Sequence, residues 1–215
     1  SYNLKFFDEW SPDVAYSFGF LMADGTVFKN GYGFSVGVVS RDESVVEFIQ
    51  GLLQGGTIHR RKGGIDNRGS TYQPRSDLVI CSKFLASKLI SMGMKPRKTY
   101  NDDPFPNIPD DMMSHFSRGY FDGDGTASIT AAGYCIVGFV GSPKFITGLR
   151  ENIIRLTGMS QRKLSINTEK YTACGRVSWS ARSDLEKFRA FLYPKGFTFC
   201  LQRKKDRLDK WLSEN

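Results

Sequence analysis

A ten-residue phrase occurs twice in this chain, one hundred residues apart. It reads SFGFLMADGT at Ser17–Thr26 and SRGYFDGDGT at Ser117–Thr126. Both copies place a serine, a glycine, an Asp-Gly pair and a threonine at matching positions. Internal repetition of this kind is decisive for a fold, because each copy is expected to form the same supersecondary unit. The chain is therefore predicted to contain two copies of one design.

The segments after the two phrases follow a common order. Apolar residues alternate or run continuously in the predicted strands and recur three and four positions apart in the predicted helices. The first half has predicted strands at 33–40, 57–62 and 72–82, and predicted helices from Asp42 and at 83–92. The second half has predicted strands at 135–142, 163–170 and 176–181, and predicted helices from Ser142 and at 184–192. With the phrase as a helix leading into a further strand, each half reads αββαββα, and the fold class is α+β.

A proline-rich segment separates the two halves. It reads NDDPFPNIP at 101–109 and contains three prolines and two adjacent acids. Such a composition is typical of a linker. The predicted organisation is an N-terminal repeat at 1–100, a linker at 101–109 and a C-terminal repeat at 110–215.

Small residues recur every four positions within each phrase, and they are Gly19, Ala23, Gly119 and Gly123. This spacing leaves a flat groove along a helix, into which another backbone can approach closely. Two such helices are predicted to pack together across a pseudo-twofold axis. Asp24 and Asp124, which end the two helices, would then lie at the same end of the pair.

Two neighbouring carboxylates repel each other unless they share a proton or bind a cation. The nearby ligands are all oxygen atoms, which favours Mg²⁺ over zinc or copper. The alternative is that Asp24 and Asp124 merely end their helices in turns. Recurrence within a duplicated helix favours the metal site. Asp122 has Met22 as its counterpart, so a role at the helix surface or between the halves is favoured over catalysis.

Composition restricts the functional class. The 215 residues are 40% hydrophobic, which is enough for a packed core, and their net charge of +8 favours a polyanionic partner. The four cysteines stand singly, so disulfide and zinc frameworks are disfavoured and a reducing intracellular compartment, either bacterial cytoplasm or an organelle, is expected. Neither a membrane span nor a leader peptide is indicated.

The two phrases and their surroundings resemble the LAGLIDADG homing endonucleases, in the form that carries two motifs on one chain. The second copy, SRGYFDGDG, is close to a common variant of the family motif, and the first, SFGFLMADG, departs from it at several letters. The resemblance covers essentially the whole chain. It implies a saddle in which two four-stranded antiparallel sheets lie along the DNA major groove and the motif helices pack at the centre.

The resemblance also implies roles for individual residues. Asp24 and Asp124 would bind the catalytic Mg²⁺, with help from the main-chain carbonyls of Ala23 and Gly123; Mn²⁺ would also serve, and Ca²⁺ would bind without cleavage. Basic phrases after the third helix of each half select Lys98 and Lys204 as catalytic, with an ordinary phosphate or helix-end contact as the alternative. Family members cut both DNA strands and leave staggered 3′ overhangs.

Alternation along the strands selects the residues that would face DNA. With Leu78, Ile80, Leu164, Ile166, Val177 and Trp179 directed toward the core, the opposite face carries Gln73, Arg75, Asp77, Lys163, Ser165, Asn167, Glu169, Arg176 and Ser178. A basic hairpin adds His59, Arg61, Lys62 and Arg68, and Arg41 matches a polar position of the family. A solvated loop is the alternative for the hairpin.

The sequence therefore predicts a monomeric, site-specific DNA endonuclease with a long, non-palindromic target of about 20 bp. The chain could be intron-encoded or free-standing. The main alternative is a non-cleaving relative of the same fold, such as an RNA maturase or a DNA-binding regulator. A generic basic nucleic-acid chaperone is disfavoured, because it has no need of paired carboxylates.

Overall fold

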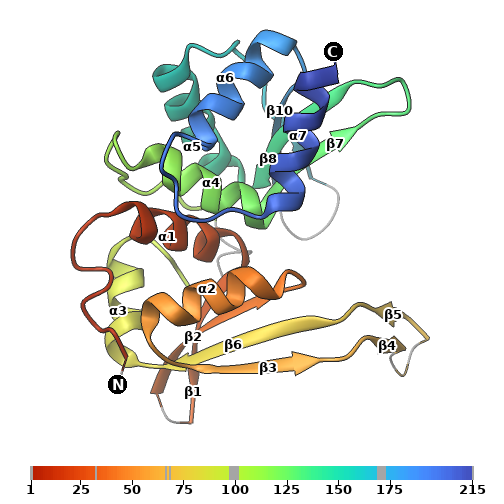
Figure 1. Ribbon diagram of the computed structural model, residues 1–215. Helices are drawn as coiled ribbons and strands as arrows, with labels where there is room; N and C mark the ends of the chain where they lie inside the picture. Colours follow the sequence, from red (N-terminus) through yellow and green to blue (C-terminus); the bar gives the residue numbers. More distant parts are fainter. Residues whose placement is uncertain are drawn as a thin grey trace.

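Two halves of similar architecture meet through one helix from each (Figure 1). The computed structural model describes residues 2–31, 33–65, 67, 69–96, 102–168 and 173–214. Helices α1 (Pro12–Asp24) and α4 (Met113–Asp124) lie side by side at the junction, and each half places its sheet and remaining helices outside this pair. The predicted duplication is therefore visible in the fold.

The first half contains α1 and a four-stranded antiparallel sheet with the order β1-β2-β6-β3. Its strands are β1 (Gly25–Asn30), β2 (Gly33–Ser40), β3 (Thr57–Arg61) and β6 (Arg75–Cys81), and its other helices are α2 (Glu43–Leu53) and α3 (Lys83–Ser91). A short hairpin of β4 (Gly64–Ile65) and β5 (Thr71–Tyr72) extends from β3 and β6.

The second half repeats this arrangement with the sheet order β7-β8-β10-β9. Its strands are β7 (Gly125–Ile129), β8 (Cys135–Gly141), β9 (Ser165–Asn167) and β10 (Cys174–Trp179), and helices α5 (Pro143–Thr157) and α6 (Arg182–Leu192) follow β8 and β10. The predicted αββαββα order and α+β class are confirmed. The chain then closes with α7 (Gln202–Glu214).

Local sequence explains how the motif helices begin and end. Ser11 accepts a hydrogen bond from the backbone N–H of Val14 at 3.3 Å, and Pro12 occupies the first helical position, where its missing N–H costs nothing. Gly25 and Gly125 end α1 and α4 in extended conformation and become the first residues of β1 and β7. Each motif thus runs from a helix directly into its sheet.

The core of each half lies between the inner face of its sheet and its helices. Alternating residues on the central strands are buried, as predicted for Leu78, Ile80, Val177 and Trp179. Helix α7 buries Leu208 and Trp211, and the indole N–H of Trp211 donates to the carbonyl of Gly133 at 2.7 Å. The closing helix therefore packs against the β7–β8 hairpin. None of the helices formed by the described residues is both long and apolar enough to cross a membrane.

Three details differ from the sequence-based predictions. The predicted strand at 72–82 is interrupted at residues 73–74, and its start belongs to the small β4–β5 hairpin. The predicted strand at 163–170 is reduced to β9 among its described residues. Ile166, predicted to be in the core, is 53% exposed. It pairs with Gly175 at the sheet edge, beyond the part of the sheet that α5 covers.

Candidate functional site

The two motif helices cross in direct backbone contact. A Cβ built on Gly19 would lie 2.0 Å from the main-chain oxygen of Phe116, and one built on Gly119 would lie 2.0 Å from that of Tyr16. Real Cβ atoms do not approach oxygen this closely, so only glycine permits the crossing. The reciprocal contacts show that the two helices are related by a near-twofold arrangement.

The C-terminal ends of the same helices also meet. A Cβ built on Gly123 would lie 2.3 Å from the Cβ of Ala23 and 3.5 Å from Oδ2 of Asp24. The carboxylate of the first motif therefore lies against the backbone that leads into Asp124 of the second. Both aspartates are half-buried, so they are accessible to solvent and to a ligand.

Electrostatic effects place the two carboxylates in one local field. Burial raises the pKa of Tyr120 well above its ordinary value, and the charges of Asp124 and Asp24 raise it further. Burial lowers the pKa of Lys204 to about 8, whereas the charges of both aspartates act to raise it. Two side chains of the second half, from α4 and α7, thus respond to the charge of Asp24 as well as to that of Asp124, which is the juxtaposition that the motifs predict.

Lys204 lies beneath this pair and is only 6% exposed. Its ammonium donates to the main-chain oxygens of Phe121, Asp122 and Gly125 at 2.6, 2.8 and 2.7 Å, with Gly123 O at 3.2 Å. These carbonyls close the C-terminal turn of α4, where a cation also interacts favourably with the helix dipole. The contact is the helix-end arrangement that the sequence left open as the alternative. Lys98, the counterpart that the sequence also predicts to be catalytic, lies outside the described residues.

Asp122 connects the halves beneath the candidate site. It is 2% exposed, and its Oδ2 accepts hydrogen bonds from the Tyr16 hydroxyl at 2.7 Å and from the backbone N–H of Leu201 at 2.8 Å. Burial raises the pKa of Asp122 to about 6, although both hydrogen bonds act to lower it. Its position between the halves agrees with the non-catalytic role favoured by the sequence.

The structure also identifies residues that the sequence did not single out. Tyr16 and Arg118 are fully buried at the junction, and the Arg118 guanidinium lies 5.4 Å from the centroid of the Tyr16 ring. Arg118 donates to the carbonyls of Leu192 and Phe199 at 2.9 Å each. In the sequence, the only sign of this cluster is that the other half has no polar residue at the positions equivalent to Tyr16 and Arg118.

The outer face of the first sheet carries an ion-pair cluster. Asp77 forms salt bridges with Arg61 and with Arg75, the latter at 3.1 Å. The prediction that Asp77 faces away from the core is consistent with this, but its side chain is largely covered rather than open for reading bases. Arg61 and Arg75 keep about half or more of their side-chain surface exposed. Arg41, His59, Lys62 and Gln73 are also exposed.

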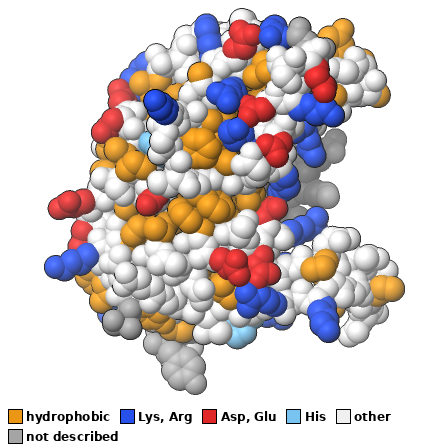
Figure 2. All heavy atoms as spheres, in the orientation of Figure 1, with side chains coloured by type: hydrophobic (Ala, Val, Ile, Leu, Met, Phe, Trp, Pro, Cys, Tyr) orange, Lys and Arg blue, Asp and Glu red, His pale blue; other side chains and the backbone are white. Residues whose placement is uncertain are grey.

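The outer face of the second sheet is exposed at Lys163, Ser165, Asn167, Arg176 and Ser178. Arg68 and Glu169, predicted to contact DNA, lie outside the described residues. Figure 2 shows that the molecule is recessed between the halves on the side toward which the β4–β5 and β7–β8 hairpins project, with Lys and Arg side chains along the recess.

Strand pairing aligns the two sheets residue by residue. Val38 pairs with Gly25, and Phe139 pairs with Gly125, so β2 and β8 share one register. One residue further along, Val39 pairs with Asp77, and Val140 pairs with Arg176. Asp77 and Arg176 therefore occupy equivalent positions and carry opposite charges.

The oxygen atoms at the site suit a divalent cation shared by the two motifs. No group of three or more His, Cys, Asp or Glu side chains that could hold a metal occurs among the described residues. The chain instead supplies two carboxylates and the adjacent main-chain carbonyls, and the absence of a side chain at Gly123 lets Ala23 and the Asp24 carboxylate lie close to the backbone of the second motif. Hard cations such as Mg²⁺ favour few carboxylates together with water and phosphate oxygens. The residues present therefore fit such an ion.

These features define a class: a duplicated αββαββα saddle with paired Asp-Gly helices at its centre, which is the fold of the single-chain LAGLIDADG homing endonucleases. The homing endonuclease I-WcaI bound to its DNA recognition sequence matches with a TM-score of 0.59 and 14% identity over 95% of this chain and 90% of that chain. The LAGLIDADG meganuclease I-AabMI bound to uncleaved DNA matches with a TM-score of 0.60, at the same identity and coverage.

The same fold also occurs in the N-terminal LAGLIDADG domain of WhiA, which matches with a TM-score of 0.51 and 10% identity over 90% of each chain. At the level of sequence, no protein-family model and no curated protein matches this chain. The family resemblance seen in the two motifs is thus shown at the level of the fold.

Proposed function

We propose that this protein is a site-specific DNA endonuclease that depends on a divalent metal ion. The observation that carries the proposal is the placement of Asp24 against Gly123, next to Asp124, at the end of two helices in backbone contact. A DNA-binding scaffold alone has no need of two half-exposed carboxylates in one field. The DNA-bound I-WcaI and I-AabMI structures support the same reading of the fold.

Each part of the structure has a distinct task in this proposal. The two sheets, with exposed Arg75 and Arg176 on their outer faces, would bind and orient a duplex along the recess. Asp24, Asp124 and the carbonyls of Ala23 and Gly123 would hold the ion. A bound divalent ion supplies polarisation of the phosphate and activation of water, so no nucleophilic side chain is required.

Cleavage of both strands would leave 3′ overhangs, and the chain would act as a monomer on double-stranded DNA. Mg²⁺ is the proposed physiological ion; Mn²⁺ would replace it, and Ca²⁺ would support binding without cleavage. A non-cleaving DNA-binding protein of the same fold, which also occurs in the N-terminal LAGLIDADG domain of WhiA, is the second candidate. The retention of both carboxylates at one point favours the endonuclease.

The experiment is a cleavage selection from a randomised duplex library in Mg²⁺, repeated with Ca²⁺ and with EDTA. Products are sequenced at both ends to define the target and the overhang. The parent should cleave in Mg²⁺ alone. Asp24→Asn and Asp124→Asn should each abolish double-strand cleavage and leave DNA affinity in Ca²⁺ within about tenfold, because the ions serve chemistry more than docking.

Asp206→Asn is the matched control, because it removes the same charge from an exposed position on α7. It should cleave like the parent. Undiminished cleavage by both Asp24→Asn and Asp124→Asn would rule out the assigned site. Tight binding of a selected duplex by a parent that cleaves nothing would favour the regulator.

A further inference from the structure

The end of α4 and the start of α7 are bound to each other in both directions. Asp122, in the last turn of α4, accepts the backbone N–H of Leu201, the residue before α7. In return Lys204, in the first turn of α7, donates to carbonyls in the last turn of α4 and to that of Gly125, which follows it. The last carbonyls of a helix generally lack partners within the helix, although Phe121 O also accepts the backbone N–H of Gly125, the residue that caps α4. Each helix therefore supplies polar partners to the end of the other one.

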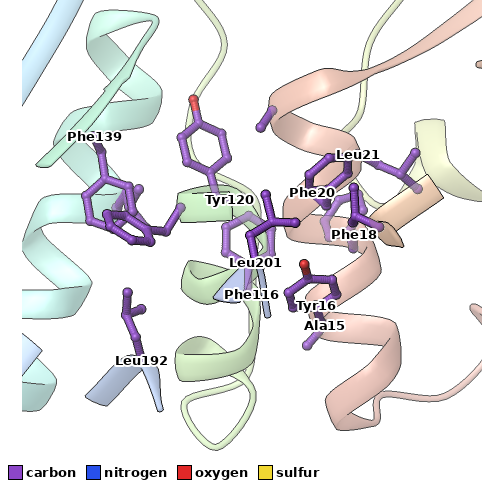
Figure 3. Packing of buried hydrophobic residues seen from close by; sticks show 14 of the residues in the cluster. Ala15, Tyr16, Phe18, Phe20, Leu21, Phe116, Tyr120, Phe139, Leu192 and Leu201 are labelled. Atoms are coloured by element: carbon purple, nitrogen blue, oxygen red, sulfur yellow. The ribbon is translucent and has the colours of Figure 1, made fainter. Parts of the chain in front are cut away.

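The same carboxylate oxygen also reaches the other half. Oδ2 of Asp122 accepts the hydroxyl of Tyr16, which belongs to α1. The Tyr16 ring is held edge-on by Phe199 at 5.6 Å, and Phe199 lies in the connection between α6 and α7 that runs along the junction (Figure 1). Figure 3 shows Tyr16 on the α1 side and Phe116 and Tyr120 on the α4 side of this buried cluster. One carboxylate thus joins α1, α4 and α7.

Charge balance makes Asp122 difficult to replace. Arg118 and Lys204 are buried cations whose charges act on it. Their hydrogen bonds go to main-chain carbonyls and, for Arg118, to His115 at 2.9 Å. Because buried cations are costly without a compensating charge, the negative charge of Asp122 stabilises both. The first motif has Met22 at this position, so among the motif helices only α4 supplies the carboxylate.

We propose that Asp122 is a positioning residue for the paired carboxylates: by joining α1, α4 and the first turn of α7, it fixes the relative placement of Asp24 and Asp124. This role rests on the proposed endonuclease function. Because its side chain is buried, Asp122 is assigned no contact with the DNA or the ion. Displacement of a catalytic group by about 1 Å can cost roughly 100-fold in rate, so loosening this connection should affect chemistry before it affects docking.

The test compares Asp122→Asn and Tyr16→Phe with Asp184→Asn. Asp184 is a matched control, because it is 1% exposed and accepts the backbone N–H of Ser160 at 2.8 Å, far along the chain from the motif helices. Three quantities are measured at a temperature where every variant is folded. They are the single-turnover cleavage rate of bound target in Mg²⁺, DNA affinity in Ca²⁺, and hydrogen exchange of the peptide that contains Leu201.

Asp122→Asn should slow cleavage of bound DNA roughly 10- to 100-fold and leave affinity within about threefold, which is the pattern of a lost positioning interaction. Tyr16→Phe should have a smaller effect in the same direction. Exchange around Leu201 should accelerate in Asp122→Asn alone. Asp184→Asn should lose thermal stability but cleave within about threefold of the parent rate.

An active parent with an equally active Asp122→Asn variant would overturn the positioning role and leave the endonuclease proposal standing. An equal loss of rate in Asp184→Asn would also overturn it, because the effect would then follow from destabilisation alone. A folded parent that cleaves no member of the target library would instead contradict the endonuclease function.

Discussion

Gly19 and Gly119 are equivalent residues that each lie against the backbone of the other helix, where even a methyl group would come within 2.0 Å of a carbonyl oxygen. The obstructing atoms belong to main chain, so a small rotamer change cannot relieve the contact. The whole junction between the halves depends on these two positions having no side chain.

Overpacking a core typically costs roughly 1–3 kcal/mol. Gly119→Ala should therefore lower the free energy of unfolding by about 3 kcal/mol or more, and Gly119→Leu should lower it further. Thermal and urea unfolding would measure the change. Gly51→Ala is the control, because Gly51 lies in α2 with open space at its Cβ position, and alanine there should stabilise by about 0.5–1 kcal/mol. A Gly119→Ala variant as stable as the parent would contradict the close crossing.

The parts of the fold that sequence could predict are those written in local patterns. Small residues at a spacing of four, followed by Asp-Gly, indicated two helices that pack closely and end together. The structure shows α1 and α4 doing so. Alternation placed Val177 and Trp179 in the core correctly, because β10 is central in its sheet and covered by α5.

Predictions were wrong or incomplete where tertiary placement decides. Alternation assigned Ile166 to the core-facing side of its strand. It could not indicate that this strand lies at the edge of the sheet, where the side chain remains exposed. Lys204 was selected from a basic phrase, yet its burial against α4 depends on where the α6–α7 connection crosses the junction. The bond between Asp122 and Tyr16 joins residues 106 positions apart, which no local pattern encodes.

An ion pair between the halves should contribute little stability and should vanish in acid. Arg203 binds both oxygens of Asp42, at 2.9 and 2.6 Å, and its hydrogen bonds lower the pKa of Asp42 below 3.8. The contribution is therefore complete above the unfolded-state pKa and is lost as the pH falls through the folded-state pKa. Because both side chains are partly exposed, the coupling energy near neutral pH should be about 0.2–1 kcal/mol.

A double-mutant cycle with Asp42→Asn and Arg203→Gln measures this coupling at neutral pH and again near pH 2. The pair Arg182–Glu186 within α6 serves as a reference that does not cross the junction. A coupling energy that persisted in acid would show that the interaction is not an ion pair.

Arg176 should read DNA directly, because it is exposed on the outer face of β10. Arg176→Ala should weaken target binding by about 1–3 kcal/mol and relax the preference at one base pair. Arg182→Ala is the matched control, since it removes the same charge from α6, on the helical side of the sheet. Equal losses of affinity and specificity in the two variants would contradict the assignment of the sheet face to DNA.

The last prediction concerns stoichiometry and target symmetry. A protein with one motif per chain must dimerise to bring two carboxylates together, and its twofold symmetry favours a palindromic site. This chain carries both motifs, and α1 and α4 already pair within it. One molecule should therefore occupy each target, which light scattering of the protein–DNA complex can measure.

The two half-sites of that target should differ, because the two sheets present different chemistry at equivalent positions. Where the first sheet carries Asp77, held by two arginines, the second carries an exposed Arg176. An arginine pairs best with guanine. A carboxylate instead accepts a hydrogen bond from cytosine, or it neutralises the charge of the arginines beside it. With about one helical turn of groove per repeat, footprinting should show a non-palindromic span of about 20 bp. Two chains per duplex, or a perfectly palindromic preferred site, would show that the internal duplication does not replace a dimer.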